Sequence, residues 1–164
     1  MWILFFLVIL DITWYLVYSI SKNNWKIPES ISSCSYITKK PVLFTVWMIS
    51  LAGLIMPLLL SLCNPGAWYQ FLGFLISVSL GFVASSPLYK SEETVIHVIG
   101  GVSFVVFSQL FIILEGMWYI TACLIPVYLG LCLYLKKKRI DEYVWWGELM
   151  TIFTLITYCL IKLI

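Results

Sequence analysis

Residues 94–135 read TVIHVIGGVSFVVFSQLFIILEGMWYITACLIPVYLGLCLYL, two apolar runs separated only by Glu115 and Gly116. A run of about 20 apolar residues is long enough for an α-helix to cross roughly 30 Å of hydrocarbon. Each run is expected to be helical, because lipid offers no partner for backbone amides outside the span. Because so short a break can hold only a turn, the two helices are predicted to form an antiparallel hairpin.

The same reasoning extends outward along the whole chain. Runs of this length occupy residues 1–20, 42–62, 67–86, 94–114, 117–135 and 143–164. No basic residue precedes the first run and no small-residue cleavage site follows it, so we expect a retained helix rather than a signal peptide. The predicted fold is all-α: one integral membrane domain over residues 1–164, built as a polytopic transmembrane bundle of six spans.

The composition excludes several other classes of protein. Of the 164 residues, 62% are hydrophobic and 11% are charged, whereas soluble domains carry roughly 25% charged residues. A soluble enzyme, a disordered chain and a nucleic-acid-binding module are therefore excluded. The five cysteines show no CxxC spacing, so we expect neither a disulfide framework nor a bound metal, and no motif predicts a cofactor.

Lysine and arginine are concentrated in alternate connections between the spans. The second and fourth connections hold none, and Lys162 near the C-terminus falls on their side. The positive-inside rule then places the basic connections in the cytoplasm and both termini outside, in a multi-pass protein of the plasma or inner membrane. The basic residues in question are Lys22, Lys26, Lys39, Lys40, Lys90, Lys136, Lys137, Lys138 and Arg139.

Small residues recur at strict four-residue spacing in the third span, at Gly73, Ser77, Gly81 and Ser85. Small residues let helix backbones approach closely in lipid. We therefore expect this helix either to lie at the centre of the bundle or to make the main contact of a homo-oligomer.

Ionisable residues within the spans are costly and are functional candidates by default. Asp11 lies near the middle of the first span, where it either supports proton or cation movement or forms a hydrogen bond between helices. Glu115 is expected to be a turn residue at the surface. The candidates for a ligand or ion pathway are Asp11, Ser85, Glu93, His97, Ser108 and Glu148.

Most of these polar groups fall near the cytoplasmic ends of three spans. Glu93 and His97 are one helical turn apart and share a face, and Ser85 and Glu148 are expected at a similar depth. The sequence predicts either a cytoplasm-facing polar pocket made by these four residues or a network of helix-capping hydrogen bonds.

The first connection, residues 21–41, is the only long one among the predicted connections. It places Trp25, Ile27, Ile31 and Tyr36 among serines and lysines. This composition is compatible with a segment on the membrane surface, such as a short helix begun by Pro28, and equally with a solvated loop.

Residues 87–97, PLYKSEETVIH, followed by Gly100 and Gly101, resemble a stretch of the small six-helix membrane proteins of the damage-regulated autophagy modulator type and their bacterial relatives. The resemblance covers about 30 residues. It implies a multi-helix membrane protein without established catalysis, and no other function is transferred from it.

Three kinds of function stay open. The first is a non-enzymatic channel-like protein, transporter or ligand-responsive effector with a cytoplasm-facing pocket. The second is an intramembrane enzyme acting on lipid, which the single histidine and the absence of HExxH and GxSxG motifs disfavour. The third is a scaffold that docks partners through its cytoplasmic loops. The expected partners are membrane lipid, a second copy of the chain and a cytoplasmic ligand or protein, with no nucleic acid.

Overall fold

A computed structural model describes residues 1–85, 93–138 and 142–164, with only the backbone at positions 93 and 94. Within these ranges the chain is helical and has no strand. Six helices are long and apolar enough to cross a membrane, which confirms the predicted six-span bundle. The helices are α1 (Trp2–Lys22), a short α2 (Cys34–Ile37), α3 (Pro41–Leu62), α4 (Phe71–Ser85) preceded by the 3-10 turn η1 (Trp68–Gln70), α5 (Glu93–Leu114), α6 (Trp118–Lys138) and α7 (Tyr143–Leu163).

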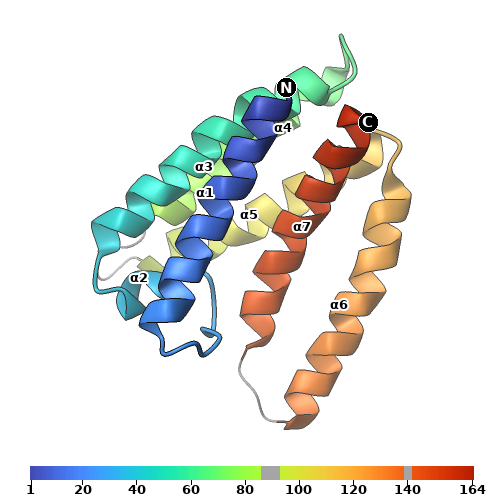
Figure 1. The fold of residues 1–164 in the computed structure, drawn as a ribbon. Helices are drawn as coiled ribbons and strands as arrows, with labels where there is room; N and C mark the ends of the chain where they lie inside the picture. The colour runs from blue at the N-terminus through green and yellow to red at the C-terminus, as the bar shows by residue number, and fades with distance from the viewer. Residues whose placement is uncertain (86–92, 139–141) are drawn as a thin grey trace.

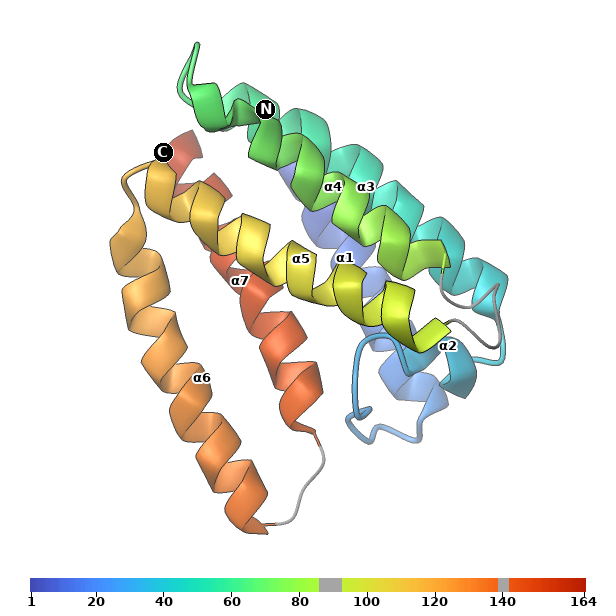
Figure 2. The same ribbon diagram turned by 180° about the vertical axis from the view of Figure 1, so that it is seen from behind.

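The helices are arranged around α3, α4 and α5, which pack side by side (Figures 1 and 2). α1 packs on α3, and α5 runs obliquely across the bundle toward α6. α6 and α7 form a hairpin with α6 outermost, and both termini lie at one end of the molecule (Figure 1). The connection between α1 and α3 lies at the opposite end.

An aromatic cluster joins α1 to α3. The rings of Tyr15 and Trp47 stack with centroids 4.0 Å apart and an interplanar angle of 11°. The Trp47 indole N–H also donates to the carbonyl oxygen of Asp11 at 3.0 Å. Because the rings are almost fully buried, this pair combines apolar burial with a hydrogen bond that satisfies the indole.

The closest helix approach differs from the one that the small-residue stripe suggests. A Cβ atom on Gly73 would meet Leu60 Cδ2 at 3.3 Å, whereas one on Gly81 would meet nothing within 4 Å. Ser77 is buried and its hydroxyl donates to the Gly73 carbonyl in its own helix. α4 packs against α3 and α5, and the tightest contact with its backbone is made by Gly100 of α5, where a Cβ would lie 3.0 Å from Ser79 O.

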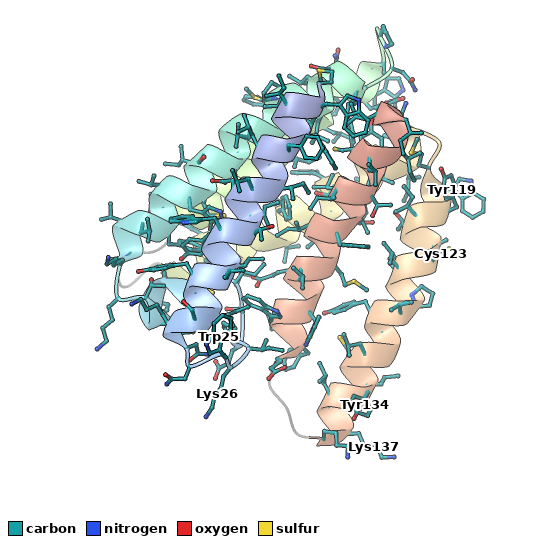
Figure 3. The ribbon with its side chains drawn as sticks, in the orientation of Figure 1. Trp25, Lys26, Tyr119, Cys123, Tyr134 and Lys137 are labelled. Atoms are coloured by element: carbon teal, nitrogen blue, oxygen red, sulfur yellow. The ribbon has the colours of Figure 1, made fainter. Side chains whose placement is uncertain are left out.

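α6 is the most peripheral of the six long helices. Its buried side chains are Ile120, Thr121 and Leu135, and most of its other side chains are exposed at the outer edge of the bundle. Figure 3 shows Tyr119 and Cys123 projecting from its outer side. In a bilayer this face is in contact with lipid.

Candidate binding groove

The connection between α1 and α3 docks against the bundle, so it is not a solvated loop. Ile31 and Cys34 are buried in the main core, and burial raises the pKa of the Cys34 thiol to about 11. Trp25 and Tyr36 remain exposed. The short helix of this segment begins at Cys34 and not at Pro28, so that expectation was wrong in its position.

Two hydrogen bonds attach this connection to α7. The backbone N–H of Trp145, in the first turn of α7, donates to the carbonyl of Glu29 at 3.0 Å. The backbone N–H of Ile31 donates to Oε2 of Glu148 at 2.6 Å. The first bond satisfies an amide that the helix itself leaves without a partner, and the second anchors a carboxylate inside the protein.

A groove of about 580 Å³ lies between this connection, α5 and α7. We call it the α5–α7 groove. At its polar end it is lined by Glu29, Ser30, Ser32, His97 and Glu148. The hydroxyls of Ser30 and Ser32 are 2.9 Å apart.

The remaining wall of the groove is apolar. The α5 valines recur at helical spacing along one face of the helix, and most of them are exposed, so the groove opens sideways to the lipid. The apolar lining consists of Val98, Gly101, Val102, Val105, Val106 and Val144, with Tyr143 at the rim.

The structure brings together part of the candidate pathway. His97 and Glu148 line the same groove. Ser85 and Ser108 are not among its described lining residues, and their hydroxyls donate to Phe82 O and Phe104 O within their own helices. The side chain of Glu93, and residues 87–92 that carry most of the family resemblance, lie outside the part of the chain that the structure describes.

Asp11 lies apart from the groove, between α1 and α3. Its Oδ1 accepts a hydrogen bond from Ser50 Oγ at 3.4 Å. Its Oδ2 is buried and has no hydrogen-bond partner among the described residues. Because Ser50 belongs to α3, this hydrogen bond joins α1 to α3.

A second cavity of about 330 Å³ lies between α5, α6 and α7 and shares Val105 with the groove. Gln109 of α5 lines this cavity and forms side-chain hydrogen bonds to α6 and α7. Its Nε2 donates to Thr154 Oγ1 at 2.9 Å, and its Oε1 accepts from Thr121 Oγ1 at 2.8 Å. Gln109 is therefore satisfied by interhelical hydrogen bonds.

Glu115 is not a surface residue, and this expectation was wrong. Its side chain is 0% exposed, and Oε2 lies 2.6 Å from Lys162 Nζ. Oε1 accepts from the Asn64 N–H at 3.1 Å and from the Cys63 thiol at 3.2 Å. Burial acts to raise the pKa of Glu115, but these hydrogen bonds outweigh it and leave the pKa below its ordinary value.

The groove also contains residues that sequence reasoning did not select. Glu29 is the only acidic residue in the segment 21–41, and serines follow it at positions 30, 32, 33 and 35. That local enrichment in polar groups was a usable signal. The sequence did not show that this segment folds back onto α7, because the two parts are more than a hundred residues apart.

In comparisons with known proteins, no family model, no curated protein and no solved structure matches this chain.

Among the residues that the structure describes, no group of three or more His, Cys, Asp or Glu side chains is placed to hold a metal ion.

Proposed function

We propose that this protein is a membrane protein of the transporter or ligand-responsive type that binds an amphiphilic molecule in the α5–α7 groove. The observation that carries the proposal is the mixed lining of the groove, which combines polar residues, among them His97 and Glu148, with a wall of valines. A molecule with a polar head and an apolar tail matches both parts at once.

The size and the opening of the groove suit such a ligand. Small-molecule sites occupy roughly 300–1,000 Å³ and combine mainly apolar walls with a few polar groups, and this groove holds about 580 Å³. The exposed valines Val98, Val102 and Val106 line its side. A tail can therefore enter from the bilayer while the head stays at the membrane surface.

We further propose that the polar end faces the cytoplasm and that both termini lie outside, in the plasma or inner membrane. Trp25, Lys26, Tyr134 and Lys137 lie at one end of the bundle (Figure 3), which is the end of the first connection. Lys162 lies at the other end but is paired with Glu115. This charge asymmetry supports the orientation through the positive-inside rule.

Filling the groove tests the proposal. A Cβ at Gly101 would meet nothing within 4 Å, so Gly101→Leu is expected to fold and to occupy the groove. Gly130→Leu is the matched control, since Gly130 has the same open surroundings on the exposed side of α6. The measurement is saturable binding of radiolabelled dodecylammonium, dodecanol and dodecanoate to the purified protein in phosphatidylcholine nanodiscs, corrected for empty nanodiscs.

The expected result is that at least one probe binds saturably to the wild type and to Gly130→Leu but not to Gly101→Leu. If no probe binds in a way that Gly101→Leu abolishes, the groove is not an amphiphile site and the proposal is wrong.

A further inference from the structure

We infer that the α5–α7 groove selects amphiphiles whose head is a cationic ammonium group, held between the carboxylates of Glu29 and Glu148. This inference rests on the proposed function and adds the chemical class of the ligand. It starts from the charges that the groove presents to a bound head.

The described polar lining of the groove is acidic. It contains the two carboxylate-bearing residues Glu29 and Glu148, the hydroxyls of Ser30 and Ser32, and His97, and its described residues include no Lys or Arg. The lysines described at this end of the bundle, such as Lys26, are not among the described lining residues. A cation entering the groove therefore meets complementary charge, whereas an anion meets repulsion.

The fold holds these two residues against each other's elements, Glu29 by its backbone and Glu148 by its carboxylate. The backbone bonds Trp145 N–H to Glu29 O and Ile31 N–H to Glu148 Oε2 fix residues 29–31 against the first turns of α7. Glu29 uses its backbone carbonyl for this attachment, so its carboxylate is not used in it. Glu148 accepts the Ile31 N–H with Oε2, and the described groove residues include no Lys or Arg.

The chemistry of an ammonium group fits these acceptors. An ammonium carries several N–H donors and no acceptor, and carboxylate and hydroxyl oxygens are the acceptors that line the polar end. A charge-assisted bond to a carboxylate is about twice as strong as a neutral one. Its strength increases where lipid and protein exclude water. The valine wall then takes the alkyl chain and gives no preference among heads.

The experiment compares the three probes, which share one chain and differ in the head. We expect dodecylammonium to bind to the wild type about tenfold more tightly than dodecanol, and dodecanoate more weakly still, a tenfold difference corresponding to about 1.4 kcal/mol. Glu29→Gln and Glu148→Gln should each remove most of this preference. Both variants are expected to fold, because Gln keeps an oxygen to accept the Ile31 N–H and the Glu29 bond is made by the backbone.

The control is Glu142→Gln, which removes one acidic charge from the same end of the molecule. Glu142 is the N-cap residue of α7, makes no side-chain cap bond and is not among the groove residues described. The control should retain the full preference for dodecylammonium. Loss of preference in this variant to the same degree as in Glu148→Gln would show a general surface-charge effect and overturn the inference.

The outcomes separate the two proposals. If all three probes bind with equal affinity and Gly101→Leu abolishes their binding, the amphiphile site is supported and the preference for ammonium is overturned. Absence of any Gly101-sensitive binding would overturn the site itself. Competition by phosphatidylethanolamine added to the nanodiscs would support a bilayer lipid as the source of the ammonium head, and retention of full dodecylammonium binding would support a free amine.

Discussion

Lys162 Nζ lies 2.6 Å from Glu115 Oε2, and this ion pair joins the last turn of α7 to the turn between α5 and α6. The carboxylate is fully buried and the lysine side chain is 19% exposed. Asn64 participates from a third element, because its backbone N–H donates to Glu115 and its side-chain Oδ1 accepts from Lys162. At the end of the bundle where the termini lie, one network thus connects the turns that follow α3 and α5 with the last turn of α7.

Removing the cation of this pair should destabilise the protein. Lys162→Met leaves the Glu115 carboxylate buried without a counter-charge, and breaking a buried pair costs roughly 3 kcal/mol. Reversible unfolding in detergent micelles measures the loss. Lys137→Met at the other end is the control and should change the free energy of unfolding by less than about 0.5 kcal/mol. Equal stability of the two variants would contradict this account of the ion pair.

The same carboxylate should make stability depend on pH. The pKa of Glu115 is lower in the folded protein than its ordinary value of 4.5, so the folded state binds fewer protons than the unfolded state near that pH. The stabilisation from Glu115 is then complete above about pH 4.5 and is lost as the pH falls through the lower folded pKa. The wild type should lose its stability advantage over Glu115→Gln on acidification below that value. An advantage that stays constant through this range would contradict the assignment.

Gly100 and Gly101 should respond differently to the same substitution. Alanine gains about 1 kcal/mol of helix propensity at either position. At Gly100, however, the new Cβ would lie 3.0 Å from backbone atoms of Ser79 and Val83, whereas Gly101 has open space. Gly100→Ala should therefore be less stable than Gly101→Ala by about 1–3 kcal/mol. Equal free energies of unfolding would show that α4 and α5 can separate without cost.

Gln109 should matter for the attachment of α6. Gln109→Leu removes the hydrogen bonds to Thr121 and Thr154, and interhelical hydrogen bonds of this kind contribute about 0.6 kcal/mol each in membrane proteins. We expect a loss of about 1 kcal/mol and faster hydrogen exchange in α6. Thr157→Val is the control, because among the described residues the Thr157 hydroxyl bonds to Phe153 O of its own helix and to no other helix. Unchanged exchange in α6 would contradict a tethering role.

Labelling with an impermeant thiol reagent checks the orientation. Lys39→Cys lies at the end with the first connection, and Trp68→Cys lies at the opposite end, where the termini are. In sealed right-side-out vesicles, Trp68→Cys should react and Lys39→Cys should react only after permeabilisation. The reverse pattern would place the groove on the outer side.

The six spans were predictable because their signal is local. Each is a run of apolar residues as long as the bilayer requires, and the structure gives bounds within a few residues of those expected, such as Tyr143–Leu163 for the run at 143–164. His97 and Glu148 were expected at a similar depth in their spans, and both line the α5–α7 groove. Depth along a helix can be deduced from sequence position, because each residue adds a constant rise.

Contacts between distant segments could not be deduced in this way. Glu115 follows a span and precedes a glycine, which is typical of an exposed turn, and nothing local indicates that Lys162 lies beside it. Likewise, the four-residue spacing from Gly73 through Ser77 to Gly81 shows which residues share a face of α4 but not which face α5 covers. That choice depends on the oblique crossing of α5, which places Gly100 against Ser79.

The hydrogen bonds from Trp145 and Ile31 also have a consequence for biosynthesis. Residues 29–31 leave the ribosome early, yet the partners that fix them are on α7, which is translated last among these helices. A nascent chain that has inserted α1 to α6 still lacks one side of the site that we assign to the ligand. The proposed binding site is therefore complete only after α7 has been made and inserted, because Trp145 and Glu148 belong to this last helix.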